Sequence, residues 1–101
     1  MDNAFSWNDK TVVGSKLELI DDKSIGVYSF GQDGLAPVTA GAKDGPVMAP
    51  LFYWRIEGDK LVLSEEKNGK ALGTFQFVSR DGDILTLRVG NGSLQRYRYS
   101  R

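Results

Sequence analysis

The sequence predicts an all-β protein, an eight-stranded antiparallel barrel of the up-and-down meander type. Three observations predict this class. Glycine-containing turn pairs recur along the 101 residues, apolar and polar residues alternate between the turns, and no segment has the length and 3.6-residue period of a helix. A β-sandwich shares the alternation and is the alternative fold, but regular short hairpins favour a meander over the crossing connections of a sandwich.

The turns are marked by pairs of glycine with aspartate or asparagine, which tolerate the left-handed backbone of tight hairpins. These pairs are Asp33-Gly34, Asp44-Gly45, Gly58-Asp59, Asn68-Gly69, Asp81-Gly82 and Asn91-Gly92, with Asp21-Asp22 as a weaker seventh turn. Seven turns separate eight strands. A sheet with one apolar face and no covering helix can bury that face by pairing its last strand with its first.

The segment from Pro50 to Ser64, PLFYWRIEGDKLVLS, fixes the register of the sheet. Phe52, Trp54 and Ile56 share one face of a strand whose side chains alternate with a period of two. Gly58-Asp59 forms a two-residue turn, so the facing strand continues the same apolar face. The resulting cross-strand pairs are Ile56 with Leu61 and Trp54 with Leu63.

The other turns extend this register along the chain. We assign three-residue loops to each x-Asp-Gly and x-Asn-Gly segment and a two-residue turn to Asp21-Asp22, because a one-residue slip would turn an apolar set outward. The expected neighbours are Leu17 and Leu19 with Gly26, Tyr28 and Phe30, then Phe30 with Ala36, Tyr28 with Val38, Ala40 with Met48, Ala36 with Phe52, Leu61 with Phe75, Leu63 with Gly73, Phe77 with Leu85, Phe75 with Leu87, and Leu85 with Tyr97. The expected inner set is Val13, Ser15, Leu17, Leu19, Tyr28, Phe30, Val38, Met48, Phe52, Trp54, Ile56, Leu61, Leu63, Phe75, Phe77, Leu85, Leu87, Val89, Tyr97 and Tyr99.

The closing strand, Arg96-Tyr97-Arg98-Tyr99, admits two registers. A three-residue loop at Gly90-Asn91-Gly92 points its tyrosines inward, whereas a two-residue turn at Asn91-Gly92 would point Arg96 and Arg98 inward. Buried arginines need counter-charges, so the second register would imply an anionic ligand or internal carboxylates. We favour the first register, because Arg80-Asp81-Gly82 needs the same three-residue loop.

The predicted domain organisation is a single β-barrel domain over residues 11–101, preceded by residues 1–10. Phe5 and Trp7 have no strand partner, and we expect them to form a lid over one end of the barrel. A frayed N-terminal tail is the alternative, because chain termini are commonly poorly ordered.

Composition excludes several classes of function. Thirteen basic and thirteen acidic residues cancel, so no global field attracts nucleic acid or an anionic membrane. Cysteine and histidine are absent, which removes the common thiolate and imidazole chemistry, and we expect no metal and no cofactor. No apolar run reaches the roughly 20 residues of a membrane helix, and MDNAFSWNDK lacks the regions of a signal peptide. The sequence assigns no compartment.

Candidate catalytic residues are few. Asp21-Asp22, Glu65-Glu66 and Asp81-Gly82-Asp83 lie in turns or at strand ends, where acidic residues serve the turn itself. Carboxylates paired for acid–base work must converge in a cleft, and a serine nucleophile needs a base such as histidine. We therefore expect the protein not to be an enzyme.

Several strands together resemble the calycin group, in particular small bacterial lipocalin-like domains. The resembling pieces are Leu17-Glu18-Leu19-Ile20, Val27-Tyr28-Ser29-Phe30, Tyr53-Trp54-Arg55-Ile56, Lys60-Leu61-Val62-Leu63 and the closing Arg96-Tyr97-Arg98-Tyr99. The lipocalin Gly-x-Trp signature is not met, because Gly14-Ser15-Lys16 has no tryptophan. The Arg-x-Tyr pair of fatty-acid-binding proteins is not met either, because arginine and tyrosine here lie on opposite faces. The resemblance implies the barrel fold and an interior ligand, and no particular binding residue.

The interior rings are the candidate ligand site. We expect Tyr28, Phe52, Trp54, Phe75 and Tyr97 to form the wall of a pocket for one small apolar or aromatic molecule, with tyrosine hydroxyls and Ser15 as orienting groups. The alternative is a filled barrel, because an eight-stranded barrel is only just wide enough for its own side chains or one small ligand.

The outer face of strands two to five is the candidate interface. Its apolar residues are Ile25, Val27, Leu35, Val47, Leu51, Tyr53 and Val62. A contiguous apolar group of this size is typical of a homodimer or protein-partner surface, and we place that interface at Val27, Leu35, Leu51, Tyr53 and Val62. Ordinary β-propensity is the alternative explanation for these residues.

Overall fold

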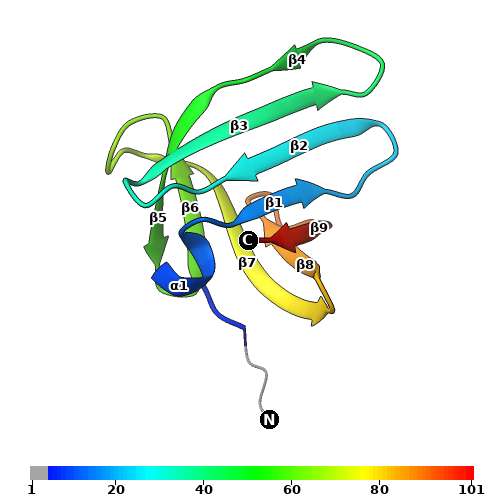
Figure 1. The fold of residues 1–101 in the computed structure, drawn as a ribbon. Coiled ribbons are helices and arrows are strands. Elements are labelled where there is room, and N and C mark those ends of the chain that lie inside the picture. Colours follow the sequence, from blue (N-terminus) through cyan, green and yellow to red (C-terminus); the bar gives the residue numbers. More distant parts are fainter. Residues whose placement is uncertain (1–4) are drawn as a thin grey trace.

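A computed structural model describes residues 5–101, in which nine β-strands follow one short helix (Figure 1). The elements are α1 (Asp9–Val12), β1 (Lys16–Leu19), β2 (Ser24–Ser29), β3 (Leu35–Ala42), β4 (Val47–Met48), β5 (Leu51–Glu57), β6 (Lys60–Ser64), β7 (Ala71–Asp81), β8 (Ile84–Val89) and β9 (Leu94–Ser100). Residues 1–4 of the predicted N-terminal segment lie outside the described residues.

The strands form a closed antiparallel barrel, as the sequence predicts. Apart from β4 and β5, strands that follow one another in the chain pair, and β1 pairs with both β2 and β9, so the sheet closes on itself. Both β4 and β5 pair with β3, which means that together they form the fourth predicted strand. The barrel therefore has eight strands around its circumference, and β4 is a short extension beyond it.

The predicted register is confirmed for most hairpins. The paired residues include Tyr28 with Val38, Ala36 with Phe52, Ala40 with Met48, Trp54 with Leu63, Ile56 with Leu61, Leu61 with Phe75, Leu63 with Gly73, and Leu85 with Tyr97. The first hairpin differs: Leu17 pairs with Tyr28, two positions beyond the Gly26 that a two-residue Asp21-Asp22 turn places opposite it, so that predicted turn is wrong, although the inner face is unchanged. Glycine at position 58 has a φ of 61°, as a tight turn with Gly first requires.

The β7–β8 hairpin departs from the prediction. Its turn is a two-residue Gly82-Asp83 turn, because Asp81 pairs with Ile84. A β-bulge between Phe77 and Ser79 then adds one residue to β7 and restores the alternation. The predicted pairs of Phe77 with Leu85 and Phe75 with Leu87 are wrong by two positions; the observed pairs are Phe77 with Leu87 and Phe75 with Val89. All these side chains nevertheless face the same side.

The closing hairpin has the predicted three-residue loop. The amide of Val89 donates to the Ser93 carbonyl at 2.9 Å, and Gly92 has a left-handed φ of 90°. Tyr97 and Tyr99 are buried, and Arg96 and Arg98 are exposed. The analogy with residues 80–82 that favoured this register was wrong, because that segment makes a different turn; the register follows from the loop's own left-handed glycine.

Residues 9–12 form a helical turn where the sequence predicts the approach to the first strand. Asn8 caps it: its side-chain oxygen accepts from the amides of Lys10 at 2.9 Å and Thr11 at 3.1 Å, and Thr11 Oγ1 accepts from the Asn8 amide at 3.0 Å. The turn buries Val12 completely and leaves Val13 half-buried, contrary to the predicted inner set. Four residues are too few to show a helical period, which is why the pattern missed this element.

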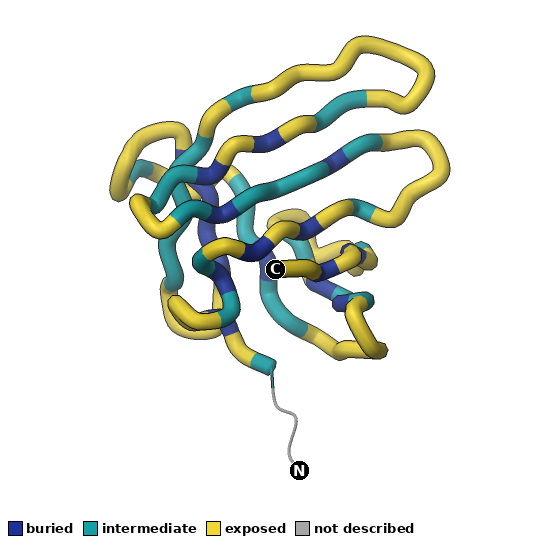
Figure 2. The backbone as a smooth tube through the Cα atoms, in the orientation of Figure 1, coloured by how far each residue is buried: buried dark blue, intermediate teal, exposed yellow. Residues whose placement is uncertain are grey.

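The core lies inside the barrel, and buried residues alternate with more exposed ones along β1, β3, β8 and β9, whereas β6 is buried from Leu61 to Ser64 (Figure 2). Met48 is a correction to the predicted inner set. Its side chain is 68% exposed, because β4 extends past the barrel, where the interior is not enclosed by other strands.

Candidate functional site

The two ends of the barrel differ. At the closed end the chain enters through α1, and the turns after β2, β5 and β7 lie there; at the open end lie the turns after β1, β6 and β8 and the β3–β4 hairpin (Figure 1). This division follows from eight alternating antiparallel strands, and it sorts the inward-facing residues into a closed half and an open half.

The N-terminal segment packs into the closed end. The Trp7 indole is 5% exposed, and its Nε1 donates to the Phe75 carbonyl at 2.9 Å. The ring of Phe5 lies 5.1 Å from that of Trp7, 5.1 Å from that of Phe77 and 5.3 Å from that of Tyr99. These contacts tie residues 5–7 to β7 and β9.

Hydroxyl groups and an arginine complete the closed end. Tyr99 donates to the Thr11 carbonyl at 2.7 Å, and Ser15 donates to the Val12 carbonyl at 2.6 Å. The Arg80 guanidinium lies 5.6 Å from the centre of the Phe5 ring, within cation–π range. Ser15, one of the predicted orienting groups, therefore uses its hydroxyl to hold the chain itself.

Three of the five predicted wall residues meet in the middle of the barrel. The ring of Phe75 lies edge-on to Tyr28 at 5.2 Å and to Tyr97 at 5.5 Å, and the two tyrosine rings are 6.1 Å apart. Phe75 and Tyr97 are buried, whereas Tyr28 is half-buried. We call these three residues the ring trio; it separates the closed half from the open half.

The other two predicted wall residues lie apart from the ring trio. Trp54 Nε1 donates to the Gly31 carbonyl at 2.7 Å, and its ring packs edge-on to Phe30 at 6.4 Å, so its polar group serves the β2–β3 turn. Phe52 lies two residues nearer the open end, opposite Ala36, and is half-buried. Phe52 therefore lies in the open half, whereas the Trp54 side chain holds the β2–β3 turn.

One inward-facing position of the open half, Gly73, has open space beside it. In the same half the inward-facing residues Leu19, Phe52 and Val89 are half-buried and Leu63 is buried, while the closed half likewise contains both completely buried residues, such as Leu61 and Leu85, and half-buried ones, such as Ile56 and Phe77. A Cβ built on Gly73, which pairs with the buried Leu63, would meet no atom within 4 Å. A Cβ on the inward-facing Gly26 would instead meet Leu19 Cβ at 3.3 Å. The space therefore lies on the β6–β7 side of the open half.

Gln95 is a candidate residue that the sequence reasoning missed. It pairs with Leu87 and faces inward, and its Oε1 accepts from the Tyr97 hydroxyl at 2.6 Å. Gln95 precedes the inward-facing Tyr97 by two residues on the same strand, and this spacing was the sequence signal that it also faces inward. Burial raises the pKa of Tyr28. Burial also raises the pKa of Tyr97, with a smaller contribution from the nearby Tyr28, so both hydroxyls stay neutral.

The predicted interface residues differ in exposure. Val27, Leu35 and Tyr53 are half-buried, and Leu51 is exposed. Val62 is 2% exposed and offers no surface to a partner, which corrects its place in the predicted interface. Its outer-face neighbours on β5 and β7 are Arg55 and Thr74.

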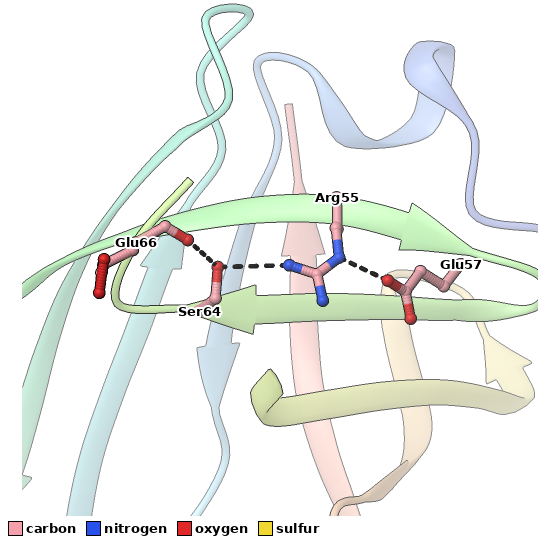
Figure 3. A network of polar contacts seen from close by, with 4 residues as sticks. All are labelled: Arg55, Glu57, Ser64 and Glu66. Atoms are coloured by element: carbon pink, nitrogen blue, oxygen red, sulfur yellow. Dashed lines mark hydrogen bonds and ion pairs between the residues drawn. The ribbon is translucent and has the colours of Figure 1, made fainter. Parts of the chain in front are cut away.

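A polar network covers the outer face of β5 and β6 (Figure 3). Arg55 Nε donates to Glu57 Oε2 at 2.6 Å, and Arg55 Nη1 lies 3.5 Å from Ser64 Oγ. Ser64 donates to the Glu66 carbonyl at 2.6 Å. The Arg55 side chain lies along these two strands in Figure 3, which places charge where the sequence suggested an apolar surface.

Exposed apolar side chains gather instead at the free edge of β4. Val47, Met48 and Leu51 are 49%, 68% and 53% exposed. Among the described strands β4 pairs with β3 alone, so its other edge carries unpaired backbone groups.

Within residues 5–101 no group of three or more acidic, cysteine or histidine side chains could hold a metal ion. The described helix is too short to cross a membrane. Comparison with known proteins adds no relative: no protein-family model, curated protein or solved structure gives a significant match to this chain.

Proposed function

We propose that the protein is a lipocalin-like binding module that takes one small apolar or aromatic ligand in the open half of its barrel. The observation that carries the proposal is the open space beside Gly73, in the half of the barrel where the inward-facing Leu19, Phe52 and Val89 stay partly exposed. Apolar surface exposed inside a concavity gains free energy when a ligand displaces its water, at about 25 cal/mol per Å².

The division of the barrel supports this location. Trp7 and Val12 are buried at the closed end, and the ring trio lies between them and the open half. The ligand would contact Phe52, Leu19 and Val89 and rest on Tyr28. Small ligand sites are commonly concave, mostly apolar and largely preformed, and we propose that the open half provides such a site.

The proposal includes no catalytic step. Tyr28 and Tyr97 are the ionisable groups that the described residues place in the ring trio, and their raised pKa values keep them neutral near pH 7. Neutral phenols without a partnered base offer neither an activated nucleophile nor an acid–base pair. Binding alone is the activity that these groups support.

Filling the space tests the proposal. Toluene binding to the wild-type protein is measured by amide chemical shifts and compared with the variant Gly73→Leu, which places a side chain in the space. Thr74→Leu is the matched control, because it adds the same side chain on the same strand facing outward. We expect binding to wild type and to Thr74→Leu, and at least a tenfold weaker affinity for Gly73→Leu. An absence of toluene binding to wild type, or equal affinities, would refute the proposed site.

A second candidate function is self-association through the free edge of β4. The exposed Val47, Met48 and Leu51, beside an unpaired strand edge, favour it. This surface keeps one of the predicted interface residues, Leu51, and moves the interface toward the open end. Sedimentation equilibrium of wild type and Met48→Glu tests it: a dimer that the charge dissociates supports the interface, and a monomeric wild type rejects it.

A further inference from the structure

The polar atoms of the open half indicate what chemistry its ligand carries; this inference rests on the proposed function. Three side chains bring polar atoms to the ring trio and its open side: Tyr28, Gln95 and Tyr97. The hydroxyls of Ser15 and Tyr99 are spent at the closed end on carbonyl groups of the N-terminal segment.

Two of these side chains retain hydrogen-bond donors. The Tyr97 proton goes to Gln95 Oε1 at 2.6 Å, which leaves the Nε2 amide group of Gln95 with two donor hydrogens. Neither that nitrogen nor the Tyr28 hydroxyl has a hydrogen-bond partner among the described residues. No side-chain nitrogen or oxygen in the described part of the chain is both fully buried and unpaired, so both groups reach accessible space. They are the donors that a ligand in the open half would meet.

The same space lacks a charged partner. Along residues 5–101, the side chains that face the interior of the open half include no aspartate, glutamate, lysine or arginine; Arg96 and Arg98 face outward, and Arg80 covers the closed end. The pKa of Tyr28 and of Tyr97 is raised, so neither phenol supplies a charge. An ionised group moved into this space would lose its hydration without gaining a counter-ion.

We propose that the ligand is uncharged and carries a hydrogen-bond acceptor, such as a ketone or ester carbonyl, which accepts from Gln95 Nε2 and from the Tyr28 hydroxyl. Its apolar body lies against Phe52 and Leu19. The site discriminates against carboxylates of the same shape, because their charge has no partner, and against pure hydrocarbons, because they leave both donors unpaired.

Three ligands of matched shape separate these terms: acetophenone, ethylbenzene and benzoate. Dissociation constants at pH 7 are measured by amide chemical-shift titration of the full chain. We expect acetophenone to bind about fivefold to tenfold tighter than ethylbenzene, as one or two neutral hydrogen bonds provide. Benzoate is expected to bind at least tenfold more weakly than acetophenone.

Two variants test the assigned donors. Gln95→Leu and Tyr28→Phe should each reduce the preference for acetophenone over ethylbenzene at least twofold, while ethylbenzene affinity stays within about twofold of wild type. Gln76→Leu is the control, because Gln76 donates to Asp59 Oδ2 at 2.8 Å on the exterior. Having two separate donor variants keeps the test decisive if one of them fails to fold.

The outcomes distinguish this inference from the proposed function. If ethylbenzene binds but acetophenone binds no tighter, if benzoate matches acetophenone, or if the preference is unchanged in both variants, the donor assignment is overturned and an apolar site remains. If none of the three ligands binds wild type, the proposed function and this inference both fail.

Discussion

Truncation of Phe75 to alanine removes the ring at the centre of the barrel. The side chain is 4% exposed and packs edge-on against Tyr28 at 5.2 Å and Tyr97 at 5.5 Å. Full burial of a phenylalanine contributes about 1.5–3 kcal/mol, and each edge-to-face pair adds about 0.5–1.5 kcal/mol. We therefore expect the variant to lose about 3–5 kcal/mol of unfolding free energy, within the range for large-to-small core changes.

Urea denaturation followed by tryptophan fluorescence measures this loss, because Trp7 bonds to the Phe75 carbonyl and reports on the same core. Leu94→Ala is the control: its side chain is 53% exposed on a strand, and the expected change is within about 0.5 kcal/mol. Domains of this size are stable by about 5–15 kcal/mol, so Phe75→Leu serves if the alanine variant does not fold. A loss below about 1 kcal/mol for Phe75→Ala would show that the ring is not in a packed core.

Three further predictions concern other parts of the barrel. Trp7→Phe removes the hydrogen bond to the Phe75 carbonyl, so thermal denaturation should show a loss of about 0.5–1.5 kcal/mol. An unchanged melting curve would mean that residues 5–7 do not seal the closed end. Burial raises the pKa of Tyr97 in the folded protein, so above about pH 10, the ordinary pKa of tyrosine, Tyr97 ionises in the unfolded chain alone. The free energy of unfolding should therefore fall as the pH rises, by up to about 1.4 kcal/mol per pH unit. Denaturation midpoints measured from pH 9 to 11 should fall less for Tyr97→Phe than for wild type, and equal slopes would contradict the burial of Tyr97. Arg98→Ala breaks an ion pair with Asp83 at 3.1 Å in which both side chains are more than half exposed. The substitution should therefore change the free energy of unfolding by less than about 0.5 kcal/mol in urea denaturation. A large loss would indicate that the guanidinium is buried.

The alternation of apolar residues was sufficient to predict the barrel, because each inner residue has a fixed partner once the turns are placed. Trp54 with Leu63 and Leu85 with Tyr97 follow from turn type alone. The register of the β7–β8 hairpin could not be predicted from turn type, because Asp81-Gly82-Asp83 permits a turn on either side of its glycine. The bulge between Phe77 and Ser79 then hides the difference from the alternation pattern.

The candidate site was predictable in part. Inward direction could be read for Tyr28, Phe75 and Tyr97, and the structure brings these three together. The depth of a residue along the barrel axis could not be predicted from the sequence, because strand tilt decides which inward-facing residues share a level. For this reason Trp54 was grouped with the rings of the ring trio, whereas it packs against Phe30.

Exposure on the outer face also depends on neighbours rather than on alternation. Val62 faces outward on β6 and is still buried, whereas Met48 has inner phase on β4 and is exposed. The long Arg55 side chain lies beside Val62, and among the described strands Met48 has a neighbouring strand on one side alone.

A map of amide chemical shifts on acetophenone binding tests the central claim, a ligand site in the open half of the barrel, most directly. We expect saturable shifts that are largest at Leu19, Gly73 and Gln95, with small changes at Val12 and Ser15 in the closed end. Shifts that never saturate, or that centre on α1 or on the free edge of β4, would contradict it.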